Sequence, residues 1–329
     1  MNMMTKTNKK IRFEVDIRML NSLSRVLILV VLSLGMSLLS PQFLTNRNIV
    51  NIFTTASIPA ILAIAQTIVI LTGNIDLSIG SIFAIAGVTC GVLMKGSNIP
   101  APYAILAGLA MGASLGFING LLVAVIKLPP FIATYGVSFT AYGLASGILK
   151  GYVIYGFPDA FRFMGNGKFY GIPMAIILAV IVVFLMWLLL TRTTFGRRLF
   201  ALGANAEAAR MSGINTMGVL ILVYVLSGLI AAFAGIVQIA RINAADVELG
   251  TTLMQPAIAA VVIGGTSMYG GEGGVWGTVV GTLTMTIIQN ALILVGVPTL
   301  WQQFILGLFI IVAVLADQTV RRLTGRRTN

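Results

Sequence analysis

Residues 192–216 read RTTFGRRLFALGANAEAARMSGINT, the longest polar interruption in a sequence that is otherwise almost continuously apolar. Apolar segments of membrane length flank this stretch, ending at Leu190 and resuming at Met217. The stretch carries four arginines and one glutamate, and its central part is made of good helix formers. The pattern predicts a short amphipathic helix between two membrane spans. Such a helix offers a surface to which a partner protein can bind.

The composition extends this interpretation to the whole chain. Of the 329 residues, 58% are hydrophobic and 9% are charged, whereas a soluble domain carries roughly 25% charged residues. The apolar runs are continuous rather than alternating, which argues against a transmembrane barrel. Many of the 36 glycines lie inside apolar runs, where they permit close contact between helices in lipid. The sequence therefore predicts an all-α polytopic membrane protein.

The apolar runs predict about ten membrane helices. The eighth is short enough to be a broken or re-entrant element. The first is predicted to be an uncleaved span rather than a signal peptide, because its basic region is too long and Ser40-Pro41 is a poor cleavage site. The permease domain would span residues 26–317, between a basic segment at 1–25 and a basic tail at 318–329. The expected helices are at about 26–40, 49–71, 76–94, 101–126, 131–149, 172–190, 217–240, 251–264, 273–295 and 299–317.

The charges predict an orientation. If the chain starts in the cytoplasm and crosses ten times, fifteen of the 21 Lys and Arg residues fall on the inner side, as the positive-inside bias requires. Both termini and residues 192–216 are then cytoplasmic. The longest outer loop, about 150–171, suits docking of an external partner. A surface loop without a function is an equally good interpretation of this segment.

Several classes of function are disfavoured. The net charge of +12 comes from cations at membrane flanks, without the aromatic-interleaved basic surface of a nucleic-acid-binding protein. The chain has no histidine, which removes His-based zinc sites and His-dependent nucleophiles. The glycine-rich run 264–274 lacks the Lys-Ser/Thr ending of a phosphate-binding loop. We therefore expect no enzyme activity, no cofactor and no metal site in this chain.

Asp76 is the ionisable residue of greatest interest. It lies in TGNIDLSIGS, residues 72–81, at the junction of the second and third predicted helices. One interpretation is that Asp76 caps the third helix and makes this junction rigid. The other is a direct role in gating or coupling, because a carboxylate near hydrocarbon is costly and usually functional.

Neutral amides are the other polar side chains in or near the predicted spans. They suit a path for hydroxyl-rich solutes, and they also serve as hydrogen-bonding links between helices. Without acidic partners they argue against a proton- or sodium-driven mechanism. The pathway or gating candidates are Gln66, Asn74, Asp76, Asn119, Gln289, Asn290, Gln302 and Gln303.

Four motifs in one order resemble the membrane permeases of ABC importers for monosaccharides, the ribose, xylose, arabinose and galactose type, over about residues 45–317. The motifs are GNIDLSIG at 73–80, Asn119-Gly120 followed by PPFIAT at 129–134, TFGRR at 194–198 continuing through GANAEAAR at 203–210 to SGI at 212–214, and GGTS at 264–267.

The resemblance implies a passive permease in a bacterial inner membrane. It would pair with a second copy or a sister permease, and a periplasmic or lipid-anchored sugar-binding protein would dock outside. Cytoplasmic ATP-binding cassette subunits would bind residues 192–216. Alternatives are an importer permease for branched-chain amino acids or nucleosides, and an ion-coupled secondary transporter. The implied coupling residues are Arg197, Arg198, Gly203, Asn205, Glu207, Ala208, Ala209, Arg210 and Gly213.

Overall fold

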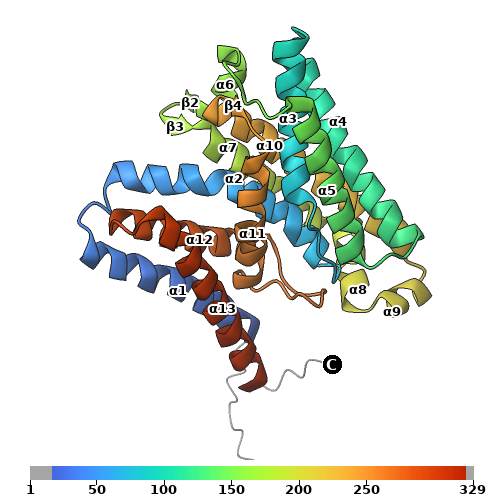
Figure 1. Ribbon diagram of the computed structural model, residues 1–329. Coiled ribbons are helices and arrows are strands. Elements are labelled where there is room, and N and C mark those ends of the chain that lie inside the picture. The colour runs from blue at the N-terminus through green and yellow to red at the C-terminus, as the bar shows by residue number, and fades with distance from the viewer. Residues whose placement is uncertain (1–16, 324–329) are drawn as a thin grey trace, which may run out of the picture.

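The computed structural model describes residues 17–323, which are mostly helical (Figure 1). The basic ends at 1–16 and 324–329 lie outside the described residues. Each of the ten predicted apolar segments coincides with one long helix. These are α1 (Ile17–Leu39), α2 (Asn46–Ile70), α3 (Ile79–Gly96), α4 (Ala101–Gly120), α5 (Pro130–Leu149), α7 (Met174–Arg192), α10 (Thr216–Ile242), α11 (Glu248–Ile263), α12 (Val275–Leu294) and α13 (Thr299–Leu323).

Shorter elements connect these helices. A π-helical turn, η1 (Leu121–Val125), extends α4, and α8 (Thr194–Ala204) and α9 (Ala206–Met211) occupy the polar stretch. The region between α5 and α7 contains α6 (Asp159–Asn166) and three strands, β1 (Ile154–Tyr155), β2 (Lys168–Phe169) and β3 (Ile172–Pro173). Strand β1 pairs antiparallel with β4 (Ala244–Ala245), and β2 pairs antiparallel with β3. Figure 1 shows α8 and α9 at the opposite end of the molecule from α6.

Seven of the described helices are long and apolar enough to cross a membrane: α2, α3, α4 with η1, α5, α7, α10 and α12. The chain is therefore a polytopic helical membrane protein. Helix α11 and the apolar parts of α1 and α13 are shorter. Ten crossings and cytoplasmic termini remain predictions.

Several helix limits differ from those expected from hydropathy. Helix α1 already begins at Ile17 instead of residue 26, α13 continues to Leu323, and α3 begins only at Ile79. Hydropathy marks the apolar part of a helix, whereas the backbone helix continues through polar residues of good propensity until a cap or a turn stops it. The short eighth segment is one helix of 16 residues, α11, which contains Pro256.

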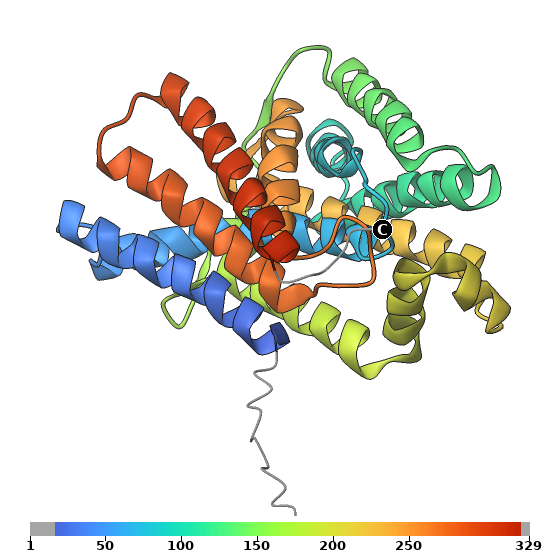
Figure 2. The same cartoon turned by 90° about the horizontal axis from the view of Figure 1, so that it is seen from below.

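Helix α10 lies in the middle of the packed helices and contacts α2, α3 and α4. The most buried spans are α2 and α3, with 78% and 72% of their apolar windows inside the protein. The least buried are α5 and α7, at 33% and 22%. Figure 2, seen from below, places α4 and α5 apart from the group formed by α1, α12 and α13. Helices α5 and α7 thus offer most of their surface to lipid or to another chain.

The contact between α4 and α10 depends on glycine. Gly108, Gly112, Gly116 and Gly120 follow one another at four-residue intervals, so they lie on one face of α4. A Cβ atom at Gly116 would lie 3.0 Å from the Cα atom of Val225 in α10, and one at Gly120 would lie 2.9 Å from that of Ile221. The two backbones touch because these positions lack side chains, as the glycines inside apolar runs predicted.

Candidate functional site

The polar stretch 192–216 folds into two helices rather than the single short helix that was expected. The Thr193 side chain accepts a hydrogen bond from Gly196 N and begins α8, and the Asn205 side chain accepts one from Ala208 N and begins α9. Asn205 is extended, with φ −162° and ψ 105°, so it separates the helices. Gly213, with φ +82°, follows α9 and allows the chain to turn into α10. The helix formers around Asn205 did not reveal this break, because a capping asparagine overrides propensity.

The helix pair is amphipathic. Leu199, Leu202 and Ala209 are buried against the rest of the protein. Arg210 forms an ion pair with Glu207 across one helical turn, at 2.7 Å, and both side chains are about two-thirds exposed. The hydrogen bond from Arg210 holds the pKa of the Glu207 carboxyl below its ordinary value. The coupling candidates that are exposed to solvent are Arg197, Arg198, Asn205, Glu207, Ala208, Arg210 and Gly213.

Three segments meet at the end of α8. They are Gly203 with Ala204, the end of α2 with its following turn at 71–73, and the glycine-rich loop at 269–271. The backbone N–H of Gly271 donates to the Leu71 carbonyl at 2.9 Å. A Cβ atom on Gly203 would lie 2.6 Å from Gly271 N, and one on Gly270 would lie 2.7 Å from Gly73 N. We call this contact the glycine junction; it requires positions without side chains on both sides.

Asp76 organises the segment that leaves this junction. Its Oδ1 atom accepts hydrogen bonds from the backbone N–H of Ser78 at 2.8 Å and from the Ser78 hydroxyl at 2.6 Å. The Ser227 hydroxyl of α10 donates to Oδ2 at 3.4 Å. Asp76 is completely buried and closes a turn before α3 rather than capping the helix, which begins three residues later.

Three further helices hold the same segment. Asn119 of α4 donates to the Ser78 hydroxyl at 2.7 Å, and Thr134 of α5 accepts from Leu77 N at 3.1 Å. The Gln66 side-chain amide of α2, with its nitrogen facing the Asp76 carbonyl, donates to that oxygen at 3.0 Å and accepts from Asp76 N at 3.3 Å. The segment 71–78 therefore touches the glycine junction at one end and α2, α4, α5 and α10 at the other.

The structure thus brings together Gln66, Asp76 and Asn119 but not the other predicted pathway residues. The Asn74 side chain donates to Thr72 in its own turn, and the Asn74 backbone N–H donates to the Val69 carbonyl. Asn290 exchanges two hydrogen bonds with Asn48, at 2.9 and 3.0 Å, and Gln302 donates to the Val297 carbonyl. Gln289 and Gln303 are exposed at other places on the surface.

Two polar residues, one on α5 and one on α11, were not anticipated. The Tyr142 hydroxyl of α5 donates to Glu248 at the start of α11, at 2.6 Å, and Thr251, Thr252 and Gln255 are exposed on the next turns of α11. A carboxylate directly before a short apolar helix was the signal that could have identified Glu248. Within residues 17–323 no group of three His, Cys, Asp or Glu side chains could hold a metal ion.

Known proteins resemble this chain over most of its length. The model of the family "Branched-chain amino acid transport system / permease component" matches residues 48–314. The ribose import permease protein of Escherichia coli strain K12 is 37% identical over 319 residues, which cover 96% of this chain and 99% of the relative. The ribose import permease protein of Bacillus subtilis strain 168 is 38% identical over 94% of this chain and 96% of its own length.

A further relative has a different sugar in its name. The D-allose transport system permease protein of Escherichia coli strain K12 is 36% identical over 86% of this chain and 87% of its own length. No solved structure matches the chain. These matches agree with the resemblance that the four sequence motifs gave. With the family model covering more than four-fifths of its length, the chain belongs to the permease components of the branched-chain amino acid transport system family.

Proposed function

We propose that this chain is the membrane-spanning permease of an importer that moves a monosaccharide across the bacterial inner membrane, with ATP hydrolysed by separate subunits. The observation that carries the proposal is the likeness to ribose import permeases along nearly the full length of both chains. The family also includes amino acid permeases by its description, but these relatives are named for sugars.

The ATPase subunits would bind the exposed face of α8 and α9. Their movement would reach the helices first through the glycine junction, because its contacts lie between backbones and have no flexible side chain to absorb a displacement. The side-chain hydrogen bonds of segment 71–78 would then carry it to α4 and α5. ATP drives import only if its bound partners favour one conformation of the permease over the other. Affinity of the permease for the sugar need not be high, since an external binding protein would deliver it.

The sugar path would follow the exposed side of α5 and α11. Thr140, Tyr142, Glu248 and Gln255 supply hydroxyl, carboxylate and amide groups there, and such groups exchange hydrogen bonds with a sugar. A carboxylate facing lipid is costly, so a second permease chain is expected to cover this side and enclose the path. The outer loop with α6 would receive the binding protein.

The test is reconstitution into proteoliposomes. The permease, its ATPase and its binding protein are expected to accumulate at least one of ribose, allose, fructose and galactose when ATP is present inside. Leucine and a nucleoside serve as competing substrates that distinguish the alternative importers. Accumulation by the permease alone, under a proton or sodium gradient without ATP, would refute the proposal.

A further inference from the structure

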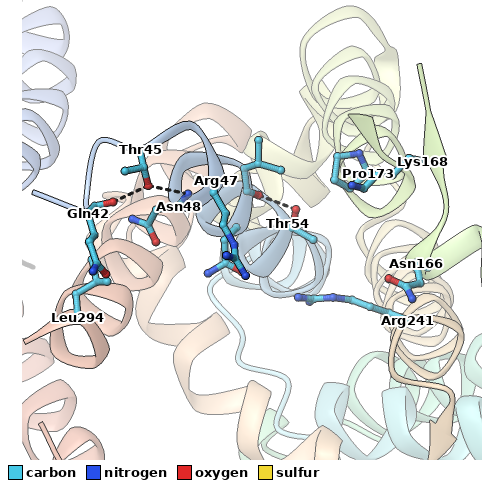
Figure 3. A pocket seen from close by; sticks show the side chains of 13 residues that line it. Gln42, Thr45, Arg47, Asn48, Thr54, Asn166, Lys168, Pro173, Arg241 and Leu294 are labelled. Carbon is cyan, nitrogen blue, oxygen red and sulfur yellow. Dashed lines mark hydrogen bonds between the residues drawn. The ribbon is translucent and has the colours of Figure 1, made fainter. Parts of the chain in front are cut away.

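A cavity of about 790 Å³ opens beside the beginning of α2, the end of α10 and the β2–β3 hairpin (Figure 3). Three cations line it, Arg47, Lys168 and Arg241, and no aspartate or glutamate does. None of the ion pairs found within residues 17–323 involves these three side chains. Figure 3 shows Arg241 extending from α10 toward α2, where Arg47 lies. The cavity therefore has the charge of an anion-binding site.

An apolar crevice of about 240 Å³ follows this cavity along α2, α7 and α12. On α2, Thr54 lines the cavity and Ser57 lines the crevice, one helical turn apart. Pro173, directly before α7, lines the cavity, and Ile176 in the first turn of α7 lines the crevice. Leu294 of α12 lines the cavity, and earlier residues of this antiparallel helix line the crevice. The cationic cavity and the apolar crevice are thus neighbours along α2 and at the start of α7.

The crevice is open toward the surroundings of the protein. Phe53, Val180, Phe184 and Trp276, which line it, are between 46% and 60% exposed. They belong to helices long and apolar enough to cross a membrane, so their exposed sides face acyl chains rather than water. A ligand of this site can therefore enter sideways from the bilayer.

We propose that these two hollows form one binding site for an anionic phospholipid. Arg47, Lys168 and Arg241 hold its phosphate-bearing headgroup, and one acyl chain lies in the crevice between α2 and α7. An acidic protein loop would satisfy the cations but leave the apolar crevice unused. A zwitterionic phospholipid would fill the crevice, but the ammonium group of its headgroup would offset its phosphate and leave the charge of the three cations largely uncompensated. The site uses no residue of the glycine junction and does not depend on the transported solute.

The test is native mass spectrometry of the full chain purified in mild detergent, with added phosphatidylglycerol or phosphatidylethanolamine. We expect the wild-type protein to retain more phosphatidylglycerol than phosphatidylethanolamine. Arg47→Gln and Arg241→Gln should each lower its retention about tenfold, because each removes charge-assisted hydrogen bonds to phosphate. Val180→Trp should lower it too by filling the crevice from an exposed position. Arg47→Lys, which keeps the charge, should retain more lipid than Arg47→Gln.

Two matched controls lie outside the site. Lys150→Gln removes an exposed cation after α5, and Leu308→Trp enlarges an exposed side chain on α13; both should bind lipid as the wild type does. Equal retention by all variants would overturn the proposal. Loss with the arginine variants but not with Val180→Trp would indicate a simple anion site and overturn it as well. Unchanged lipid with weaker capture of the sugar-binding protein would assign the cations to that partner instead.

Discussion

Helices α4 and α5 both carry spaced glycines in an apolar sequence, yet the two sets have opposite surroundings. On α4, Gly112, Gly116 and Gly120 press against the backbone of α10, and Gly108 presses against that of α3, so an added Cβ atom would collide. On α5, Gly136, Gly143 and Gly147 have no atom within 4 Å of the place where a Cβ would be. The glycines of α4 contact other helices of the same chain, whereas those of α5 contact no other helix within one chain.

The difference shows that small residues in a membrane helix do not reveal which neighbour they serve. On α5 the exposed glycines share a helix with Tyr142 and with an exposed aromatic row of Phe131, Tyr135 and Phe139. Close approach of a second helix needs such a surface. We therefore propose that the α5 glycines serve the contact with a second permease chain, while those on α4 serve the fold.

The strongest test places one large residue on each helix. Gly112→Leu should lower the free energy of unfolding by about 3 kcal/mol or more, because the new side chain has no space against α10. Gly143→Leu should change stability by less than about 0.5 kcal/mol while it reduces dimer formation and uptake. Thermal unfolding in detergent and cross-linking in membranes measure the two effects. Equal destabilisation by both substitutions would remove the distinction between the helices.

The glycine junction extends the comparison from helices to loops. Gly203→Val should leave the protein folded but lower ATP-driven uptake about tenfold, because the Cβ separates α8 from Leu71 and Gly271 and weakens the coupling free energy. ATP hydrolysis by the partner subunits should continue. Gly35→Val in α1, where an added Cβ would meet no atom within 4 Å, is the control. Uptake at the wild-type level with Gly203→Val would exclude the junction from coupling.

A smaller effect is expected in the hydrogen-bonded turn around Asp76, where polar rather than backbone contacts hold the helices. Ser78→Ala removes one donor to Asp76 and the acceptor of Asn119, and should cost about 2 kcal/mol of stability. Ser37→Ala removes a hydroxyl that bonds only within its own helix, and should have little effect. Denaturation midpoints of the two variants compare them. If Ser78→Ala is as stable as Ser37→Ala, the turn does not hold α4 in place.

The smallest structural effect concerns the exposed ion pair on α9. Glu207→Lys or Arg210→Glu should leave the free energy of unfolding almost unchanged, because solvent strongly screens the charges of an exposed pair. Each should still reduce ATP-driven uptake several-fold, because the ATPase subunit that is proposed to bind α9 would contact these charges. The doubly exchanged variant, Glu207→Arg with Arg210→Glu, restores a pair within the helix but not the original pattern. If the double variant has full uptake while both single variants lose uptake, the pair acts by stabilising α9 and not by contacting a partner.

Much of the fold follows from local sequence. The continuous apolar runs identified every long helix. Of the residues at helix boundaries, Pro129-Pro130 could be recognised from the sequence, whereas Asn205 was missed. Helix α5 starts at Pro130, close to the predicted residue 131, because proline fits the first turn of a helix. Asn205 sits among helix formers, so its capping role became visible only with the backbone conformation.

The candidate site was accessible from sequence only in part. Asp76 and Asn119 were recognised as polar groups in apolar surroundings, but Gln289 and Gln303 gave the same signal and lie elsewhere on the surface. Hydropathy measures the cost of placing a side chain in lipid, and it says nothing about the direction in which the side chain points. Tyr142 and Glu248 were missed because hydropathy does not show which way their side chains point. Their hydrogen bond joins residues 106 positions apart, so no local pattern indicates it.

The sequence by itself determined that this is a helical membrane protein, where its long helices lie and that the polar stretch 192–216 separates two of them. These features depend on the free energy of transferring each residue between water and lipid, which is a local property. Only the tertiary structure decided that Gly203 meets Leu71 and Gly271, that α4 rather than α5 packs its glycines against α10, and that three distant cations share one cavity. Those contacts depend on how helices rotate and cross, which packing between distant segments determines.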